Sequence, residues 1–180
     1  MPPTSSGPSR ARGARLDEPT ATDAWIFASI AAGRRATTLA DLVVGADSLN
    51  HAIPSAVEVR SALVRLAARR LVVARGQALS LSALGRRVHA DGRARRGGLF
   101  SIVDNMRRAM RSPRHRTEPD TAPPRFAFVT DAAMARAAAA HQRACAARVS
   151  ESVGDGAGPS TMLARCLPID AGAPRRSSSS

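Results

Sequence analysis

Residues 55–85 read SAVEVRSALVRLAARRLVVARGQALSLSALG, and within this stretch the spacing of the apolar residues changes from helical to strand-like. Ser55 followed by Glu58 is a capping box, which predicts a helix that begins after Ser55 and continues to about Arg70. The apolar residues of this helix recur at spacings of four and three, on one face: Val59, Leu63 and Leu66. The stretch therefore begins with a capped, amphipathic helix whose apolar face belongs to a core.

A short hairpin is predicted after this helix. Residues 71–74 and 78–81 are two strand-like runs, and residues 75–77, RGQ, suit a turn with glycine at positive φ. Because two strands alone cannot bury a core, the hairpin should pack against helices. Ser82 then opens a further helical turn.

Two further helices precede this stretch. The first is predicted to begin at about residue 22, to carry a broad apolar surface and to stop at Gly33 in the left-handed conformation. Thr38 and Asp41 outline a capping box for the second helix, with Asp in place of the usual Glu. The apolar face of the second helix comprises Leu39, Leu42, Val43 and Ala46. Pro54 separates it from the third helix, because the residue before a proline is disfavoured in helical geometry.

Three helices followed by a hairpin resemble the winged helix-turn-helix domains of bacterial transcription regulators. The residues that carry the resemblance are 39–49, the Ile53-Pro54-Ser55 corner, the Val59-Leu63-Leu66 face, Arg70-Leu71-Val72 and 79–86. Residues 79–86, LSLSALGR, are similar to the "apolar, Ser/Thr, x, x, Gly, Arg" ending of these families, and residues 46–54, ADSLNHAIP, look like a motif of a narrower group of uncharacterised bacterial winged-helix-like proteins. The resemblance spans about 70 of the 180 residues and implies that the third helix enters the major groove, with the hairpin as the wing.

The sequence therefore predicts a mainly α fold with a small β-hairpin, as a winged helix-turn-helix followed by one or two additional helices. The predicted segments are a disordered arm (1–21), the winged-helix domain (22–90), an amphipathic helix (91–111), a linker (112–125), an alanine-rich helix (126–149) and a disordered tail (150–180). The amphipathic helix carries a narrow apolar seam formed by Leu99, Val103, Met106 and Met110. The seam is either a fourth wall of the core or a homodimer contact, and we favour the dimer.

The charge of the chain favours a polyanion as partner. The formal net charge is +13, and all 27 basic residues are arginine. Between residues 22 and 116 there are seventeen arginines and six acids, a net of 17 − 6 = +11, so the charge is concentrated on the segment predicted to fold. A GC-rich genome favours the same excess of Arg, Ala, Gly and Pro, which leaves codon composition as an alternative source of part of the charge.

Candidate DNA-binding residues follow from the resemblance and from helix geometry. On the third helix, outside its apolar face, they are Arg60, Ser61, Arg65 and Arg69. At the wing tip they are Arg75 and Gln77, and in the turn before the second helix they are Arg34 and Arg35. An arginine can bind a guanine edge or a phosphate through two hydrogen bonds. The alternative is a solvated face, or an arginine at position 65 or 69 that pairs with an acid of another element.

The sequence carries no motif for catalysis, a cofactor or a metal, so we predict a protein that is not an enzyme. Cys145 and Cys166 lack metal-site spacing, and two cysteines are too few for a disulfide framework, which predicts a reducing, cytoplasmic compartment. No apolar stretch approaches the roughly 20 residues that cross a bilayer, and the N-terminus lacks the apolar run of a secretory signal. His51 is predicted to pack or to bond a turn near the core rather than to act as a ligand.

Three functions from different classes fit these observations. The favoured one is a DNA-binding winged-helix protein, such as a transcriptional regulator, with double-stranded DNA as its partner. The alternative is a winged-helix protein-protein interaction module without nucleic-acid binding, and a general polyanion or membrane-surface binder is the third. Arginines gathered on one surface beside a protruding third helix favour DNA. Scattered arginines, or a third helix covered by the alanine-rich helix, favour the interaction module.

Overall fold

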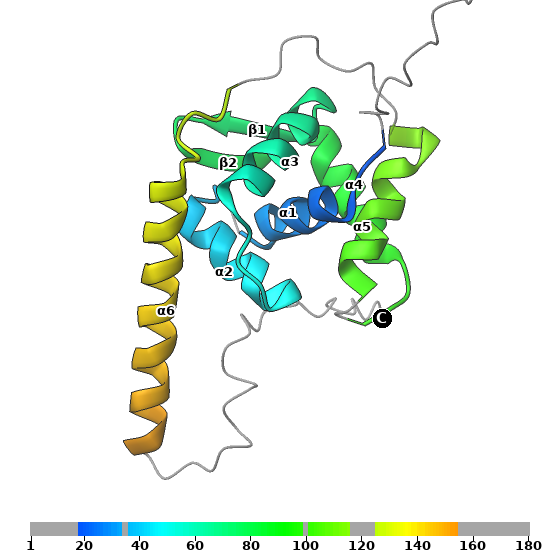
Figure 1. Cartoon of the computed structure of the whole chain (residues 1–180). Coiled ribbons are helices and arrows are strands. Elements are labelled where there is room, and N and C mark those ends of the chain that lie inside the picture. The colour runs from blue at the N-terminus through cyan, green and yellow to red at the C-terminus, as the bar shows by residue number, and fades with distance from the viewer. Residues whose placement is uncertain (1–17, 34–35, 99–100, 116–124, 155–180) are drawn as a thin grey trace, which may run out of the picture.

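The computed structural model describes residues 18–33, 36–98, 101–115 and 125–154, which form helices and one antiparallel hairpin (Figure 1). The helices are α1 (Ala21–Ala32), α2 (Leu39–Asn50), α3 (Ala56–Ala68), α4 (Ala83–Ala94), α5 (Ile102–Arg111) and α6 (Asp131–Gly154), and η2 (Pro113–His115) is a short 3-10 turn. The hairpin consists of β1 (Val72–Arg75) and β2 (Ala78–Leu81). The predicted class, mainly α with a small β-hairpin, is confirmed.

Helix α1 lies at the centre of the fold, with the other helices and the hairpin around it (Figure 1). Residues 23–30 are all buried, and the side chains of Ile26 and Phe27 have no exposed surface. A helix that is covered on most sides has to be apolar on most sides, which explains the broad apolar surface of this segment. The indole N–H of Trp25 donates to the carbonyl oxygen of Ala46 (3.0 Å) and so fixes α1 against α2.

Three helices begin with a capping box, in which a cap hydroxyl and an acid three residues later exchange hydrogen bonds with the backbone. The pairs are Thr20 with Asp23, Thr38 with Asp41, and Ser55 with Glu58. The second and third boxes confirm the predicted starts of α2 and α3. The first box is a finding of the structure. It sets the start of α1 at Ala21 and places the Asp23 carboxylate in the interior.

The hairpin is fastened to the helices by an additional bridge. β1 and β2 pair with Val72 opposite Leu81, and Gly76 turns between them with the predicted positive φ (59°). Leu79 of β2 is fully buried. It also exchanges two backbone hydrogen bonds with Thr37 (2.7 and 2.9 Å), so a one-residue strand between α1 and α2 joins the hairpin. A single bridged residue leaves no periodicity in the sequence, which is why only the structure reveals it.

Gly33 ends α1, but the predicted left-handed conformation is wrong. Its φ is −69°, in the extended part of the map. Glycine is needed there for space, because a Cβ would overlap the Thr37 hydroxyl, which donates to the carbonyl oxygen of Ile30 (3.0 Å). The close approach of the next segment, and not the handedness of the backbone, accounts for the glycine.

Helix α4 is longer than the single turn predicted after the hairpin. Residues 83–94 are helical, and the buried side consists of Gly85, Val88 and Gly92. Gly92 contacts Met106 of α5, where a Cβ would lie 2.5 Å from the sulfur atom. Two glycines lower the helix propensity of α4 and allow it to pack closely on its neighbours.

The predicted apolar seam of α5 belongs to the core of the same chain. Met106 and Met110 are buried, and Val103 is partly buried against the same cluster. Leu99 lies outside the described residues. The seam is therefore the fourth wall of the core, and the predicted homodimer contact through these methionines is wrong, because their side chains are already covered. Helix α5 also begins at Ile102, later than predicted.

Helix α6 packs along α2 with its first half, and its second half extends past the other elements (Figure 1). Met134 and Ala137 are buried, and the segment before α6 adds Phe126 and Val129 to the core. The predicted alanine-rich helix is confirmed, but it continues to Gly154 and covers more of the core than expected. Most of the predicted arm, linker and tail lies outside the described residues.

We expect Gly85→Ala to destabilise the fold. Gly85 is in the first turn of α4, and a Cβ there would overlap the backbone carbonyl oxygen of Leu71, which cannot move without shifting the hairpin. Overpacking of this kind costs about 1–3 kcal/mol of unfolding free energy. Urea unfolding measures the cost, with Gly98→Ala as the control, because nothing lies within 4 Å of a Cβ at Gly98. Equal stability of the two variants would contradict the close packing of α4.

Candidate nucleic-acid interface

Arg65, the α3 residue predicted to contact a base edge, is bound to another helix. Its Nε donates to both carboxylate oxygens of Asp23 (2.9 and 3.1 Å), and its Nη2 lies 2.7 Å from Oδ1. The Asp23 side chain is 3% exposed and also accepts the backbone N–H of Thr20 (2.9 Å). Arg65 therefore joins α3 to α1 in a bidentate, charge-assisted pair. Two possibilities followed from the sequence for Arg65: contact with DNA, or pairing with an acid of another element. In the structure Arg65 pairs with an acid.

The other α3 residues that were predicted to contact DNA either have a partner within the protein or carry no charge. The Nη1 of Arg60 donates to the carbonyl oxygen of Val129 (2.8 Å), which ties α3 to the segment that leads into α6. Arg69 is half-buried and has an interaction partner. Ser61 is half-buried and uncharged. Arg60 and Arg65 can reach a DNA groove only by giving up bonds that hold the helices together.

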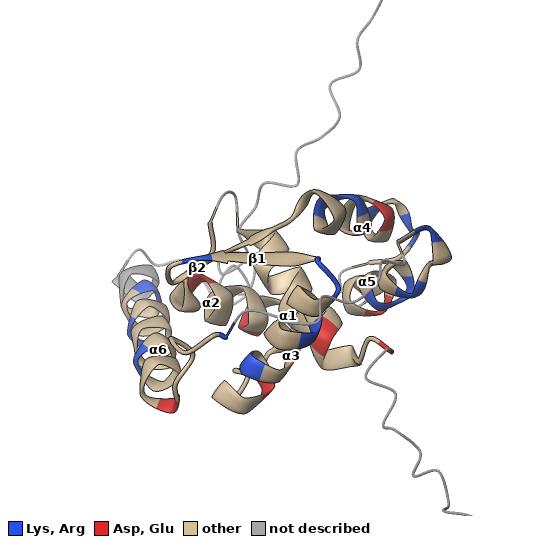
Figure 2. Cartoon of the chain, turned by 90° about the horizontal axis from the view of Figure 1, so that it is seen from above, with Lys and Arg blue, Asp and Glu red and all other residues tan. Residues whose placement is uncertain are grey.

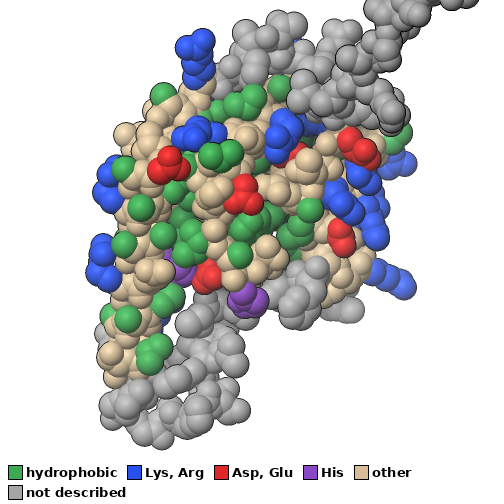
Figure 3. All heavy atoms as spheres, viewed as in Figure 1, with side chains coloured by type: hydrophobic (Ala, Val, Ile, Leu, Met, Phe, Trp, Pro, Cys, Tyr) green, Lys and Arg blue, Asp and Glu red, His purple; other side chains and the backbone are tan. Residues whose placement is uncertain are grey.

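The exposed face of α3 is apolar and acidic. Val57 is 60% exposed and Val64 40%, and Ile53 before the helix is 38% exposed. Hydrogen bonds from the backbone and then the side chain of Ser55 hold the pKa of the Glu58 carboxyl below its ordinary value. A helix that enters a groove presents cations, amides or hydroxyls to the base edges. This face presents a carboxylate, two valines and only one half-buried hydroxyl, that of Ser61. In the same view, arginines lie along the left-hand edge, over α6, and along the right-hand edge, over α5 (Figure 3).

The tip of the hairpin is exposed and carries a positive charge. Arg75 and Gln77, both predicted to contact DNA, are exposed on either side of Gly76. Neither side chain has a hydrogen bond or ion pair within the part of the chain that the structure describes. Both side chains are therefore accessible to an external partner, and their contact with DNA stays a prediction. Arg34 and Arg35, the predicted phosphate contacts before α2, lie outside the described residues.

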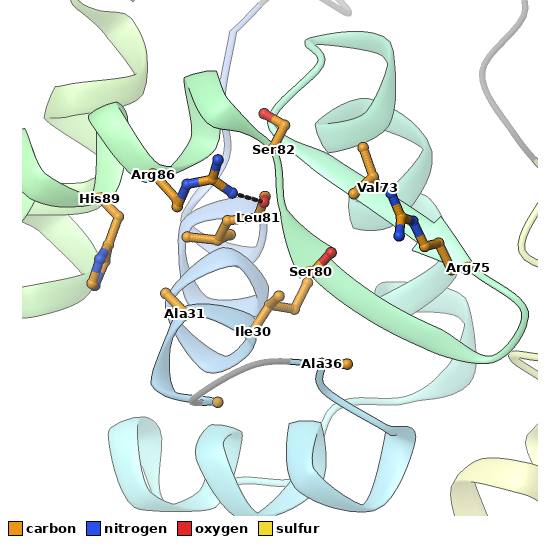
Figure 4. Close-up of a pocket in the computed structure, with 11 residues that line it drawn as sticks. Ile30, Ala31, Ala36, Val73, Arg75, Ser80, Leu81, Ser82, Arg86 and His89 are labelled. Carbon is orange, nitrogen blue, oxygen red and sulfur yellow. Dashed lines mark hydrogen bonds between the residues drawn. The ribbon is translucent and has the colours of Figure 1, made fainter.

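A cleft of about 650 Å³ separates the outer face of the hairpin from α4 (Figure 4). Arg75 lines it from the hairpin, and Arg86 and His89 line it from α4. Its walls also contain hydroxyl groups and apolar side chains, among them Ser80, Ser82, Ile30 and Leu81. The described residues that line the cleft include no acid, so the cleft is positively charged.

A cluster of arginines covers the outer side of α4 and the loop after it. We name this cluster the arginine face, and its members are Arg86, Arg87, Arg93, Arg95 and Arg96. All five are exposed, and none forms an ion pair with another described residue. The one acid in residues 86–96 is Asp91, which gives a formal charge of 5 − 1 = +4, and Asp91 is held by His115 (2.8 Å). Figure 2 shows this charge along α4, beside α5.

His89 lies between the cleft and the arginine face, and its pKa is lowered. Burial of the imidazole, and then the charge of Arg93, hold the pKa below the ordinary value of 6.5. In the unfolded chain the His89 imidazole becomes protonated as the pH falls through 6.5. In the folded protein it becomes protonated only at a lower pH. The unfolded state then binds more protons than the folded state, so stability decreases as the pH falls below that value.

We therefore expect His89→Gln to weaken the pH dependence of stability. The parent should lose stability between about pH 7.5 and 5.5, and the variant should lose less, because the residue that resists protonation is gone. Urea unfolding at the two pH values measures the difference. His51→Gln, at an exposed position, is the matched control. The same pH dependence in the parent and in His89→Gln would contradict the burial of this imidazole.

Within residues 18–33, 36–98, 101–115 and 125–154, the remaining titratable groups do not form a reactive site. His51, predicted to pack or to bond a turn near the core, is exposed and closes α2 in the left-handed conformation (φ 49°). His141 of α6 binds Asp47 of α2 (2.9 Å), and the Sγ of Cys145 lies 3.8 Å from both ring nitrogens of His141. A thiol equally far from both nitrogens is not aligned with a base. Among the described residues, no group of three or more His, Cys, Asp or Glu side chains can hold a metal ion.

Comparison with known proteins does not assign the chain to a family. No protein-family model matches it, and neither does a curated protein or a solved structure. In the part of the chain that the structure describes, no helix combines the length and the apolar character needed to cross a membrane.

Proposed function

We propose that this protein binds double-stranded DNA through a winged-helix scaffold. The observation that carries the proposal is the uncompensated positive charge of the segment between residues 22 and 116, a formal +11 from seventeen arginines and six acids. Duplex DNA carries one negative charge per about 1.7 Å of its axis, and cations that replace its counterions gain affinity. An excess of this size supports a polyanion as the partner.

The acids of this segment are already engaged inside the protein. Their roles are helix capping (Asp41 and Glu58), histidine binding (Asp47 and Asp91) and arginine pairing (Asp23 and Asp104). Two acids that pair with arginine cannot neutralise seventeen arginines. The excess charge therefore leaves arginines available to an external polyanion, and a phosphate backbone supplies an anion at every nucleotide.

The order of the elements supports the scaffold. Three helices followed by the hairpin are the order expected of a winged helix, and the Thr37 bridge fastens the hairpin between α1 and α2. The hairpin tip, which carries Arg75, is exposed and would serve as the wing on this fixed base. A fixed wing can contact a phosphate or a minor groove without first being ordered.

A duplex fits these features better than a single strand or a membrane surface. Single strands are held largely by stacking on exposed aromatic side chains, whereas Trp25, Phe27 and Phe126 are buried in the described part of the chain. Helices that lie on membranes place large apolar side chains beside their basic ones, whereas only the small Ala90 lies among the outward arginines of α4. Phosphate contact by arginine requires neither feature.

Fluorescence anisotropy of the full chain with a labelled duplex of about 20 base pairs and arbitrary sequence tests the proposal. We expect log K to fall linearly with log salt, with a slope of about −4 to −5 for about five phosphate contacts, and to change little with base sequence. Absence of binding at about 50 mM salt would overturn the proposal. Equal affinity for anionic vesicles would overturn the choice of DNA and indicate a binder of any polyanion.

A protein-interaction module is the second candidate, and the exposed face of α3 favours it. Ile53, Val57 and Val64 expose apolar surface, and Arg60 is bound by the segment before α6. The centres of protein interfaces are depleted of charged residues. The middle of the exposed face of α3 is depleted of charge in the same way. In this function a protein partner co-purifies with the parent and is lost in Val57→Glu, while the parent does not bind a duplex.

A further inference from the structure

We infer that duplex DNA lies against the arginine face, whose guanidinium groups bind phosphates, while the exposed face of α3 stays outside the DNA grooves. This inference rests on the proposed function, DNA binding, and adds the surface that performs it. It replaces the arrangement expected from the sequence, in which α3 enters the major groove. Contacts of this kind position a protein on the duplex and do not select a base sequence.

Helix α4 is a firm support for the arginine face. Its buried side consists of Gly85, Val88 and Gly92, packed against the chain near the hairpin and against α5. Arg86 and Arg93 are seven residues apart, so they point to the same outward side, about 10 Å apart along the helix axis. The exposed side chain between them on that side is the short Ala90, so the two guanidinium groups extend further outward than it does.

The guanidinium groups of the arginine face are available to an external anion. Among the described residues, only Arg86 of the five forms a side-chain hydrogen bond, from Nη1 to the carbonyl oxygen of Leu81 (3.0 Å). By contrast, Arg107 and Arg111 of α5 are paired with acids. Arginine binds a phosphate through two parallel N–H bonds, so each of these five groups can add a strong contact without breaking an ion pair.

The cleft beside α4 extends the arginine face toward the wing. Arg75 on the hairpin and Arg86 on α4 lie on either side of it, and the hydroxyls of Ser80 and Ser82 lie between them (Figure 4). The apolar side chain of Ile30 forms part of its wall. A sugar-phosphate strand needs cations and hydroxyl donors for its phosphate oxygens and apolar contact for its sugars. Arg75, Arg86 and the Ser80 hydroxyl offer the polar groups, and the exposed side chain of Val73 offers the apolar contact, whereas the Ser82 hydroxyl already donates to the carbonyl oxygen of Arg70.

The exposed face of α3 is unsuited to the same role. Placing it in a groove would bring the Glu58 carboxylate toward the phosphates, and the pKa of this group favours the charged form. Val57 and Val64 cannot form hydrogen bonds with base edges or phosphates. Electrostatics therefore orient a duplex away from this face and toward α4.

Two variants with the same loss of charge test the surface, each compared with the parent full chain on the labelled duplex. The face variant is Arg87→Gln/Arg93→Gln/Arg96→Gln. The control variant is Arg136→Gln/Arg143→Gln/Arg148→Gln, which removes three exposed arginines from α6. Gln resembles Arg in helix propensity, and a thermal melt of each variant confirms that it is folded.

We expect the face variant to lower the salt slope by about 2–3, and the affinity at about 50 mM salt by at least about tenfold, because each phosphate contact adds about 0.9 to the slope. The control variant should keep the parental slope and lose less than about threefold in affinity, because charges beyond about 10 Å are screened. Equal losses in the two variants would overturn the inference, because net charge alone would then explain the binding.

A third variant, Val64→Glu, tests the role of α3. It adds a carboxylate to the exposed face and leaves every arginine in place. We expect its affinity to stay within about twofold of the parent, and a loss of about tenfold or more would place α3 against the DNA and overturn the inference. A parent chain that does not bind the duplex at all would instead overturn the proposed function, so the two failures are distinguishable.

Discussion

Asp23→Ala is expected to destabilise the protein by about 3–5 kcal/mol. The carboxylate contacts the Arg65 guanidinium at 2.7 to 3.1 Å, and the Arg65 side chain is only 27% exposed. Removal of the acid leaves a poorly solvated cation without its partner. It also removes the acceptor of the Thr20 backbone N–H, so α1 loses a capping bond at its start. Both losses act on the contact between α1 and α3, the two helices that set the core.

Urea unfolding of two further variants separates the ion pair from the cap. Asp41→Ala removes the matching acid of an exposed capping box and should cost only about 0.3–1.5 kcal/mol. Asp23→Leu/Arg65→Leu removes both charges, so no buried cation is left without its partner. This double variant should therefore be less destabilised than Asp23→Ala alone. A loss in Asp23→Ala no greater than in Asp41→Ala would show that the pair does not stabilise the fold.

Leu63→Ala is expected to cost about 2–5 kcal/mol, a large part of the stability of a small domain. Leu63 lies in the middle of the apolar face of α3 and has no exposed surface. Truncation to alanine removes buried methyl groups and leaves a cavity that the surrounding helices cannot fully close. Leu63 belongs to the main hydrophobic cluster, so the cavity would lie inside the core.

Thermal unfolding measures this effect, and the adjacent residue supplies the control. Val64 is 40% exposed, so Val64→Ala should change the unfolding free energy by only about 0.5 kcal/mol. A melting temperature of Leu63→Ala within about two degrees of the parent would contradict the central position of this side chain. Such a result would also call into question the direction of the apolar face of α3.

Local signals predicted most of the fold, because the features that start and stop its elements lie within one or two turns. The caps at Thr38 and Ser55 and the glycine of the hairpin turn are examples, and each is found where it was expected. Helix α4 could not be predicted in this way. Its buried side contains two glycines, and the partner of Gly92 is Met106, which approaches only when the chain has folded.

The candidate site was harder to predict, because the availability of an arginine depends on where the acids of the chain fold. Arg65 was expected to point outward from α3, whereas Asp23, 42 residues earlier, meets it only after α1 has packed. The sequence contained one signal of this pairing. Asp23 lies next to the apolar run of α1, and an acid that is buried beside such a run is seldom found without a cation that pairs with it. The density of arginine in residues 86–96 was a second signal. It was not used, because the winged-helix resemblance implies that the DNA-binding residues lie on α3.

Binding of phosphates to the arginine face is tested most directly by chemical modification of arginine. Phenylglyoxal reacts with accessible guanidinium groups, and mass spectrometry locates the modified residues in the full chain with and without an excess of duplex at low salt. We expect the duplex to protect the five residues of the arginine face and to leave Arg136, Arg143 and Arg148 of α6 reactive. Equal protection of the α6 arginines, or no protection on α4, would contradict this surface as the DNA-binding site.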